Sequence, residues 1–415
     1  MELSYVNADA LVRAIGGASG EHLGAFVGSL IGKQYSVSYV CQLAQHALAF
    51  GRWCEARKIP LHALSEDDIV RYQRFRRRCR SRCVETHRRE LHALELLLHF
   101  LRNEGVCPTA PAHATPADDV TMGFARYLQH DQGLADITVE NYTRNARQFL
   151  VWRFDQGDVC LRDLDATDAI TFVQREAKRL GPSALKNVVT ALRSFLRYGQ
   201  FRGEVPAGLA AGVPAVAGWA TTPPAPQAIS AEHAQRAIDG CDCQTSVGLR
   251  DRAVLLLLAR LGLRAIEIVR LMLDDIDWEH AQLRVHGKGG QESLLPLTAD
   301  VGEAIAAYLE HGRQDSRDRH LFLRSVAPIH GLIEGSYGIG SIVRSALNRA
   351  KVDAPHRGSH QFRHALAVHM LQVGASLPEI GQVLRHRSPQ STSIYAKVDL
   401  TALRALAMTW PGGAR

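Results

Sequence analysis

The chain has little that would suit it to a membrane or to an oxidising compartment. None of its hydrophobic runs reaches the roughly eighteen uninterrupted apolar residues that a membrane-spanning helix needs. The first residues, MELSYVNADA, lack the basic start and apolar run of a signal peptide. Cysteine is scarce, at eight among 415 residues, and without a secretory signal reduced thiols are favoured over disulfides. These absences predict a cytoplasmic protein with no membrane partner.

The sequence also lacks a complete set of clustered metal ligands. Cys79, Cys83 and His87 would share one face of a helix, but no fourth ligand accompanies them, so helix packing explains them better. The acidic stretch at residues 274–277 is expected to form a solvated turn. We therefore predict neither a bound metal nor another cofactor.

Acidic residues are outnumbered by basic ones, most of all in one segment. The formal charge is +7 and the pI is near 9.1, which favours a polyanionic partner. Residues 71–90, RYQRFRRRCRSRCVETHRRE, contain nine arginines against two glutamates, and such guanidiniums repel one another unless phosphates neutralise them. A solvated helical face, or a surface that assembles protein partners, is the alternative. We expect DNA contact from Arg71, Arg74, Arg76, Arg77, Arg78, Arg80 and Arg82.

Two stretches rich in proline and alanine divide the chain. They are VCPTAPAHATPADD at residues 106–119 and AGVPAVAGWATTPPAPQ at residues 211–227, and both are typical of linkers. A chain of 415 residues is long enough for two or three separate cores. We predict an N-terminal helical domain at 1–105, a second helical domain at 118–210 and a C-terminal domain at 228–415.

The first two segments resemble each other. The first contains FGRW at 50–53, then LHALSEDDI, and closes with HFLRNEG at 99–105. The second contains FLVW at 149–152, then LRDLDATDAI, and closes with SFLRYGQ at 194–200. Both have apolar residues at helical spacing and Ser or Asp where a helix would begin. This pattern predicts an internal duplication of a small helical domain, although any two amphipathic bundles share some of it.

The C-terminal segment combines helical patterns with one predicted β-hairpin. Residues 283–297, LRVHGKGGQESLLPL, alternate as strands do on either side of a glycine-rich turn, which places Lys288 at its tip. Polar groups also interrupt apolar helical stretches at Arg264 in GLRAIEIVRL and at His360 and Arg363 in HQFRH. The start of a helix favours a bound anion, because its free N–H groups and dipole are positive.

A final group of polar residues lies in LRHRS and SIYAKVD, which contain His386 and Tyr395. Each of these residues alone could be an ordinary surface or turn residue. Together the six fit a phosphoryl-transfer site, in which two arginines clamp a phosphate, a lysine donates a proton, two histidines bind or accept protons and a tyrosine attacks. The six are Arg264, Lys288, His360, Arg363, His386 and Tyr395.

The order and spacing of these six residues resemble those of the tyrosine recombinases, also called phage integrases. In that resemblance, residues 118–210 correspond to the family's helical core-binding domain, and the C-terminal segment to its catalytic domain. It implies a mainly α fold with a small β-hairpin or sheet in the catalytic domain, an α+β arrangement, preceded by helical DNA-binding domains. Arg385 departs from the family, which usually has glycine before the histidine, and we expect it to alter packing or to contact a DNA phosphate.

The resemblance implies metal-independent strand transfer. Tyr395 would attack the scissile phosphate to form a 3′-phosphotyrosyl link, while Arg264 and Arg363 neutralise the charge that develops. Lys288 would protonate the leaving 5′-oxygen, His360 would accept the tyrosine proton, and His386 would hydrogen-bond the phosphate. The energy of the broken bond is kept in the covalent link, so no ATP is needed.

The implied function is that of a site-specific recombinase or integrase serving a mobile element. Its partners would be double-stranded DNA with specific recombination sites, other copies in a homotetramer, and accessory recombinases, all at the nucleoid. A type IB topoisomerase, a catalytically silent DNA-binding regulator and a metal-dependent nuclease or transposase are the alternatives. The tail after Tyr395 is apolar at helical spacing and could pack on its own domain or on a neighbouring protomer.

Overall fold

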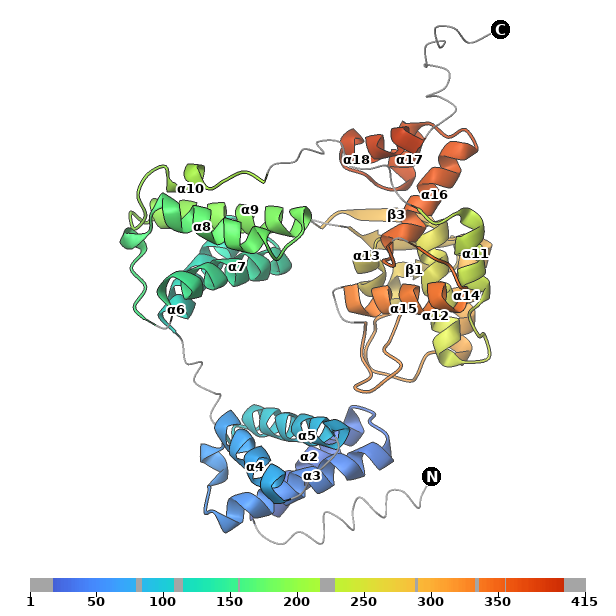
Figure 1. Ribbon diagram of the computed structural model, residues 1–415. Helices are drawn as coiled ribbons and strands as arrows, with labels where there is room; N and C mark the ends of the chain where they lie inside the picture. Colours follow the sequence, from blue (N-terminus) through green and yellow to red (C-terminus); the bar gives the residue numbers. More distant parts are fainter. Residues whose placement is uncertain are drawn as a thin grey trace, which may run out of the picture. The chain divides into compact units, whose positions relative to one another are not determined.

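A computed structural model of the chain describes residues 18–79, 84–107, 115–155, 157–216, 228–287, 290–332, 336–354 and 356–398. Most of these residues are helical, and their strands form one small antiparallel sheet (Figure 1). The predicted fold class is therefore confirmed. The described residues belong to two compact units, one within Met1–Pro60, Asp67–Leu101 and Thr222–Arg415, the other within Leu61–Glu66 and Arg102–Thr221.

The helices of residues 18–107, called the first bundle below, pack around aromatic side chains. Phe50 and Trp53 stack with ring centroids 5.9 Å apart, and Tyr72 meets Phe50 edge-on at 5.2 Å and an interplanar angle of 68°. Such edge-to-face pairs stabilise a core beyond the area that they bury. The elements are α2 (Ala18–Gly32), α3 (Val37–Ala56), η1 (Leu61–Ala63), α4 (Glu66–Cys79) and α5 (Val84–Asn103).

The helices of residues 115–216, called the second bundle, repeat this aromatic contact. Phe149 and Trp152 stack at 6.1 Å, and Phe172 meets Phe149 edge-on at 5.2 Å and 70°. The likeness of the two segments in sequence thus extends to the packing of three equivalent rings. The elements are α6 (Pro116–Arg126), the π-helical turn η2 (Tyr127–Asp131), α7 (Asp136–Phe154), η3 (Leu161–Asp163), α8 (Ala166–Ala177), α9 (Pro182–Phe201) and α10 (Leu209–Gly212).

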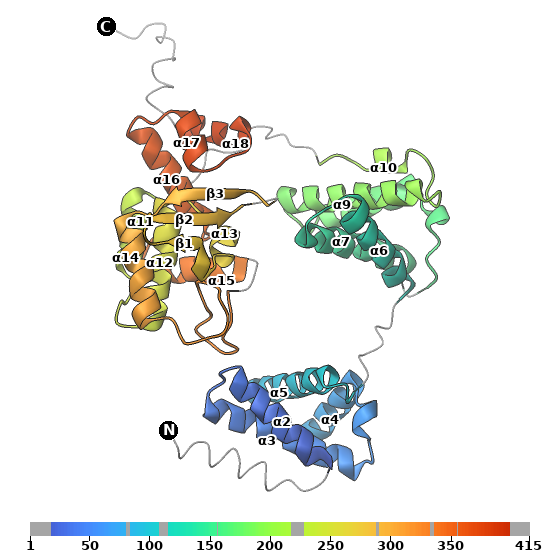
Figure 2. The same cartoon turned by 180° about the vertical axis from the view of Figure 1, so that it is seen from behind.

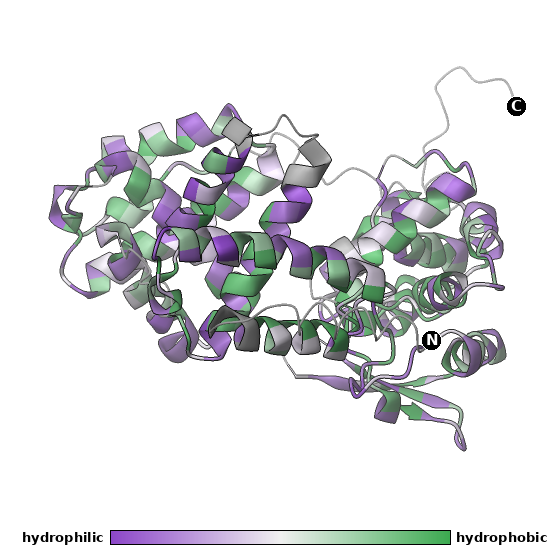
Figure 3. Cartoon of the chain, turned by 90° about the horizontal axis from the view of Figure 1, so that it is seen from below, coloured by the Kyte–Doolittle hydropathy of each residue, from purple (hydrophilic) through white to green (hydrophobic). Residues whose placement is uncertain are grey.

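Local sequence explains where the helices of the second bundle begin. Thr115 and Asp118 form a capping box ahead of α6, with Pro116 at the first helical position. Asp165 and Asp168 form the same reciprocal contact ahead of α8. Figure 3 shows hydrophobic and hydrophilic residues on different sides of many helices, as expected where one side packs on a core.

The C-terminal region packs around α12, which is buried along most of its length. Its core joins side chains of several helices and strands, among them Ile238, Leu256, Val285, Ile305 and Phe362. The helices are α11 (Ala231–Asp239), α12 (Ser246–Arg260), α13 (Ala265–Val269), η4 (Leu273–Asp275), α14 (Ala299–His311), α15 (Ser336–Arg349), α16 (His360–Gln372), α17 (Leu377–Val383), α18 (Pro389–Ser393) and η5 (Ile394–Val398).

Three antiparallel strands form the sheet of this region, in the order β1-β2-β3 (Figure 2). β1 (Ile276–Asp277), β2 (Gln282–His286) and β3 (Glu292–Pro296) include the predicted hairpin, in which Leu283 pairs with Leu295. Leu283 and Val285 are buried while their neighbours on β2 are exposed or half-buried, so the alternation seen in the sequence reflects one covered face.

Candidate active site

The segment after α12 brings the first predicted arginine to the start of a short helix. Gly262 has a φ of +58°, in the left-handed region that favours glycine. A Cβ atom there would lie 2.8 Å from Cδ2 of Leu384 and 3.0 Å from Cδ2 of Leu366. The missing side chain therefore lets α16 and the end of α17 approach this turn, and Arg264 follows as the residue that precedes α13.

Arg264 is held by the buried carboxylate of Glu267. The Arg264 Nη1 donates to Glu267 Oε1 at 2.6 Å, and its backbone N–H donates to Oε2 at 2.8 Å. Burial raises the pKa of Glu267, but the backbone N–H of Arg264 and the charge of Arg385 outweigh it, so the net pKa is lowered. Glu267, only 1% exposed, is thus an ionised group inside the site.

Arg363 lies in the first turn of α16 and is 3% exposed. Its guanidinium donates to the backbone carbonyls of Gly262 and Leu384 rather than to a carboxylate. Burial, followed by the charges of Arg264 and Arg385, lowers the pKa of Arg363 to about 10, so the group stays protonated at neutral pH. A buried cation without a carboxylate of its own is costly, and a phosphate would compensate it.

The predicted nucleophile is buried against a histidine that the sequence analysis did not assign to the site. Tyr395 is 1% exposed, and its hydroxyl lies 2.8 Å from Nδ1 of His364. Burial, then His360 and Arg363, lowers the pKa of His364 to about 4. Neutral His364 can therefore accept the phenolic hydrogen at Nδ1, when its own proton is on Nε2.

His360 lies one helical turn before His364. The two ring centroids are 6.0 Å apart, and the pKa of His360 is lowered by burial and by Arg363 and Arg264. We expected His360 to accept the tyrosine proton, whereas in the structure the Tyr395 hydroxyl contacts His364. The sequence does contain one indication that His364 belongs to the site. It follows His360 by four residues, and positions four apart share a helix face.

His386 is oriented by a hydroxyl. Its Nδ1 lies 2.7 Å from Oγ1 of Thr392, which is 3% exposed. Burial, followed by Arg363 and Arg264, lowers the pKa of His386 to about 4. If the hydroxyl donates to Nδ1, the proton of the neutral ring is on Nε2, where it can be donated to a ligand.

Arg385 points into the site. Its Nη2 donates to Glu267 Oε2 at 2.9 Å, and its side chain is 14% exposed. This placement fits the expected change in packing, and the phosphate contact stays a prediction. The guanidiniums of Arg264 and Arg385 therefore share the single carboxylate of Glu267. Both lie close enough to Arg363 for their charges to lower its pKa.

The other predicted DNA-binding arginines have mixed environments. Arg71 and Arg74 are exposed on α4, and Arg71 lies 3.4 Å from Asp68. Arg76 is half-buried, and its Nε donates at 3.1 Å to Glu90, which is 2% exposed. A set of predicted residues lies outside the described part of the chain, wholly or in its side chains: Arg77, Arg78, Arg80, Arg82 and Lys288.

The suspected metal ligands Cys79, Cys83 and His87 also lie outside the described side chains. Among the residues that the structure does describe, no group of three or more His, Cys, Asp or Glu side chains could hold a metal ion. Within the same residues, no helix combines the length and apolarity needed to cross a membrane.

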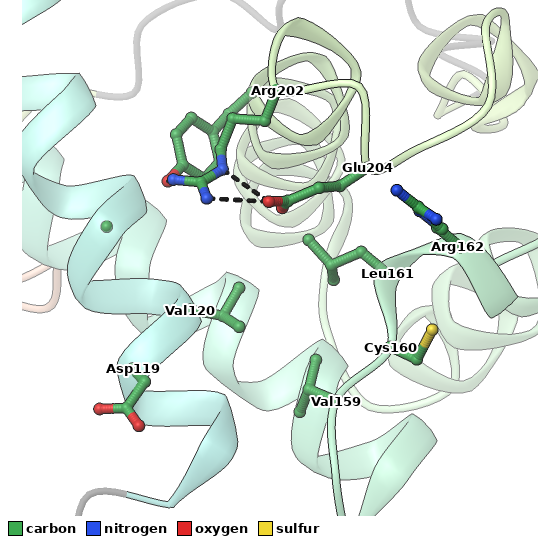
Figure 4. Close-up of a pocket in the computed structure, with 10 residues that line it drawn as sticks. Asp119, Val120, Val159, Cys160, Leu161, Arg162, Arg202 and Glu204 are labelled. Atoms are coloured by element: carbon green, nitrogen blue, oxygen red, sulfur yellow. Dashed lines mark hydrogen bonds and ion pairs between the residues drawn. The ribbon is translucent and has the colours of Figure 1, made fainter.

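A pocket of about 410 Å³ lies in the second bundle (Figure 4). None of the predicted catalytic residues belongs to its lining. Arg202 and Glu204 form an ion pair across its lining at 2.8 Å, and the Tyr198 hydroxyl accepts from Arg202 at 3.2 Å. These three polar groups therefore satisfy one another within the lining.

Known proteins resemble this chain over the site and beyond it. Residues 227–401 match the model of the phage integrase family. A Sinorhizobium fredii protein named as an integrase/recombinase, y4rA, is 41% identical over 415 residues, covering 99% of each chain. The tyrosine recombinase XerD of Listeria innocua is 26% identical over 300 residues, which cover 69% of this chain and 96% of XerD.

Solved structures share the fold. The XerH site-specific recombinase bound to a palindromic difH substrate aligns with a TM-score of 0.56 and 16% identity, covering 71% of this chain and 97% of that chain. A lambda integrase dimer bound to a COC′ core site aligns with a TM-score of 0.50 and 15% identity, covering 67% and 94%. The chain belongs to the phage integrase family, the tyrosine recombinases, and is a DNA strand-transfer enzyme.

Proposed function

We propose that this recombinase cuts and rejoins DNA at specific sites through a 3′-phosphotyrosyl link to Tyr395. The observation that carries the proposal is the 2.8 Å contact between the Tyr395 hydroxyl and neutral His364, beside the charge of Arg363. A neutral histidine at this distance can take the phenolic proton, and a guanidinium can bind the phosphate that the phenol attacks.

In the first step, the phenolic oxygen of Tyr395 attacks the scissile phosphorus while His364 takes its proton. The bond from phosphorus to the 5′-oxygen breaks, and Lys288, matched to the hairpin lysine of the family, gives that oxygen a proton. In the second step, a 5′-hydroxyl of the partner strand attacks the phosphotyrosine and gives its proton to Lys288, while the bond from phosphorus to Tyr395 breaks and the phenolic oxygen recovers its proton from His364. One phosphodiester forms for each one broken, so no ATP is consumed.

The electrostatics of the site favour this reaction. Arg264 and Arg385 contact one carboxylate, Glu267, and Arg363 lies within electrostatic range of it, which leaves an excess of two positive charges. The attack places additional negative charge on the non-bridging oxygens of the phosphate, and preorganised donors stabilise that charge strongly. His386 would add a hydrogen bond from Nε2, with its ring held by Thr392.

The nucleophile must become accessible for the reaction to occur. Tyr395 is 1% exposed, and it packs with Ala367, Ile380 and Leu384. We therefore include in the proposal a displacement of η5 on DNA binding that brings the hydroxyl to the phosphate. Burial also raises the pKa of Tyr395, so the phenol stays protonated until a base takes its proton.

The proposed substrate is double-stranded DNA with specific recombination sites, and the proposed setting is a mobile element acting at the nucleoid. Relatives named integrase/recombinase, and recombinases solved on DNA, support this choice. Exchange of both strands between two duplexes requires four cuts, and each chain supplies one Tyr395. This count supports a homotetramer on DNA, to which accessory recombinases could be added.

A two-site plasmid assay tests the function. A plasmid carrying two copies of the DNA that flanks the gene is incubated with the protein, and recombinant products are separated from relaxed plasmid. We expect recombinants only when both copies are present. Relaxation of plasmids with or without these copies, and no recombinants, would instead indicate a type IB topoisomerase.

A further inference from the structure

The backbone at Arg385 is unusual for a residue with a side chain. Its φ is +54°, in the left-handed region where a Cβ atom is unfavourable and glycine is favoured. Such strain persists only where surrounding contacts maintain it, and it is concentrated at functional sites. An arginine here therefore calls for a contact that glycine could not make.

That contact is with the carboxylate that holds Arg264. The Nη2 of Arg385 donates to Glu267 Oε2 at 2.9 Å, and Nη1 lies 3.5 Å from the backbone oxygen of Leu261. The same Oε2 accepts from the backbone N–H of Arg264 at 2.8 Å. Arg264 Nη2 also lies 3.4 Å from the backbone oxygen of Arg385. The two arginines are thus linked through Glu267 and directly through the backbone.

The charges make this link consequential. An isolated pair of Arg264 and Glu267 would be neutral overall, so the carboxylate would compete with the phosphate for the guanidinium. A second guanidinium on Glu267 offsets the charge of the carboxylate and fixes its plane, because Oε2 is held from two directions. Arg264 then keeps both a fixed orientation and a net positive surrounding.

We propose that Arg385 is a positioning residue, which orients Glu267 and thereby Arg264 toward the scissile phosphate. The inference rests on the proposed role of Arg264 as a phosphate ligand. It differs from a direct DNA contact by Arg385, because the guanidinium of Arg385 is turned to Glu267 and 14% exposed. A positioning role affects the rate of the chemical step more than the affinity for DNA.

Arg385→Gly is the informative variant, because glycine suits the backbone of this position. We expect its Tm to equal or exceed that of the natural protein, whereas single-turnover cleavage at saturating DNA falls about 10- to 100-fold. The Kd for DNA should change by less than about threefold. Arg385→Lys, which can still reach Glu267 with one donor, should recover part of the rate.

Lys351→Gly is the matched control. Lys351 is an exposed basic residue with a φ of +50°, so the change also removes one positive charge and relieves a left-handed backbone. It should raise the Tm without slowing cleavage. In a Glu267→Gln background, Arg385→Gly should cost little further rate, since the carboxylate through which it acts is already changed.

Natural cleavage rates in Arg385→Gly would overturn the inference, and so would a weaker Kd with an unchanged rate at saturation, which would indicate a phosphate contact. If Arg385→Gly unfolds, Arg385→Met, which keeps the Cβ atom, replaces it with the same expectations for rate and Kd. A natural protein that forms no covalent adduct would contradict the proposed function itself, which separates the two failures.

Discussion

Arginines in the helical bundles and arginines in the active site are balanced in different ways. In the bundles, Arg102 and Arg153 pair with carboxylates near the surface: Arg102 lies 2.6 Å from Glu66, and Arg153 lies 2.7 Å from Asp168. Glu66 is 61% exposed, so water already solvates part of this charge. Such pairs typically contribute between 0 and about 1 kcal/mol to stability.

In the active site the arginines outnumber the carboxylates that they contact. Arg264 and Arg385 share Glu267, which is 1% exposed, and Arg363 is satisfied by backbone carbonyls. Removing charges from water without an equal number of opposite charges costs stability. The difference indicates that this cluster is arranged for an anion, whereas Arg102 and Arg153 in the bundles are already neutralised by their carboxylates.

The largest expected effect is that of Arg363→Lys on cleavage. Lysine keeps the charge but loses the planar fork that now spans the carbonyls of Gly262 and Leu384. We expect single-turnover cleavage to fall about 100- to 1000-fold, as for loss of a transition-state donor. Arg102→Lys in the first bundle should leave the rate within about twofold. If Arg363→Lys and Arg102→Lys lost similar amounts of cleavage rate, the arginines of the active site would not differ in function from those of the bundles.

His364→Ala should have the next largest effect. If His364 accepts the phenolic proton, its removal should slow cleavage about a hundredfold with little change in DNA affinity. His369, exposed on the same helix, provides the matched control, and His369→Ala should cleave at the natural rate. A natural rate in His364→Ala, with a loss in His360→Ala instead, would return the role of base to His360.

The two regions should also lose stability in different ranges of pH. In the folded protein the pKa values of His364 and His386 are about 4, below the ordinary value of 6.5, so unfolding takes up protons between these values. Stability around the active site is therefore lost as the pH falls from about 6.5 to 4, by at most about 1.4 kcal/mol per pH unit for each histidine.

The ion pair of Arg102 and Glu66 in the first bundle loses its contribution to stability at lower pH. The side-chain hydrogen bond from Arg102 lowers the pKa of Glu66 from 4.5 to about 2, so its contribution is lost as the pH falls through that range. Hydrogen exchange at amides of α17 and of α4 can follow the two regions separately. Simultaneous loss of protection in both regions near pH 6 would contradict the separate ranges.

The smallest expected effect concerns DNA binding by the first bundle. Each arginine that neutralises a phosphate contributes nearly one unit to the slope of log K against log salt. Changing the exposed Arg71 and Arg74 together to Gln should therefore flatten the slope by one to about two units. Arg102→Gln, which alters a residue already paired with Glu66, should leave the slope unchanged. An unchanged slope with lost cooperativity would favour a protein-assembly surface.

The sequence predicted those parts of the fold and the site that depend on local patterns. The hairpin at 283–297 alternates over consecutive residues, and β2 and β3 form there. Arg264 interrupts an apolar helical stretch of the sequence, and in the structure it precedes a helix. The family resemblance was carried by short motifs of this kind, and the comparisons confirm the family.

The contacts that the sequence could not predict join residues far apart in the chain. His364 and Tyr395 are separated by 31 residues, and which histidine of α16 meets the hydroxyl depends on how η5 packs against that helix. The inward direction of Arg385 depends on Glu267, 118 residues earlier. In the sequence Arg76 cannot be told from its neighbours in the basic run, but in the structure it donates to Glu90 of α5.

The central claim is that Tyr395 forms the covalent link to DNA, and trapping with a nicked suicide substrate tests it most directly. Loss of the short 5′-hydroxyl fragment after cleavage prevents religation, so the adduct accumulates and its peptide can be identified by mass spectrometry. We predict a nucleotide on Tyr395, and no adduct in Tyr395→Phe even though that variant binds DNA with a Kd within about twofold. An adduct that persists in Tyr395→Phe, or that is located on another residue, would contradict the claim.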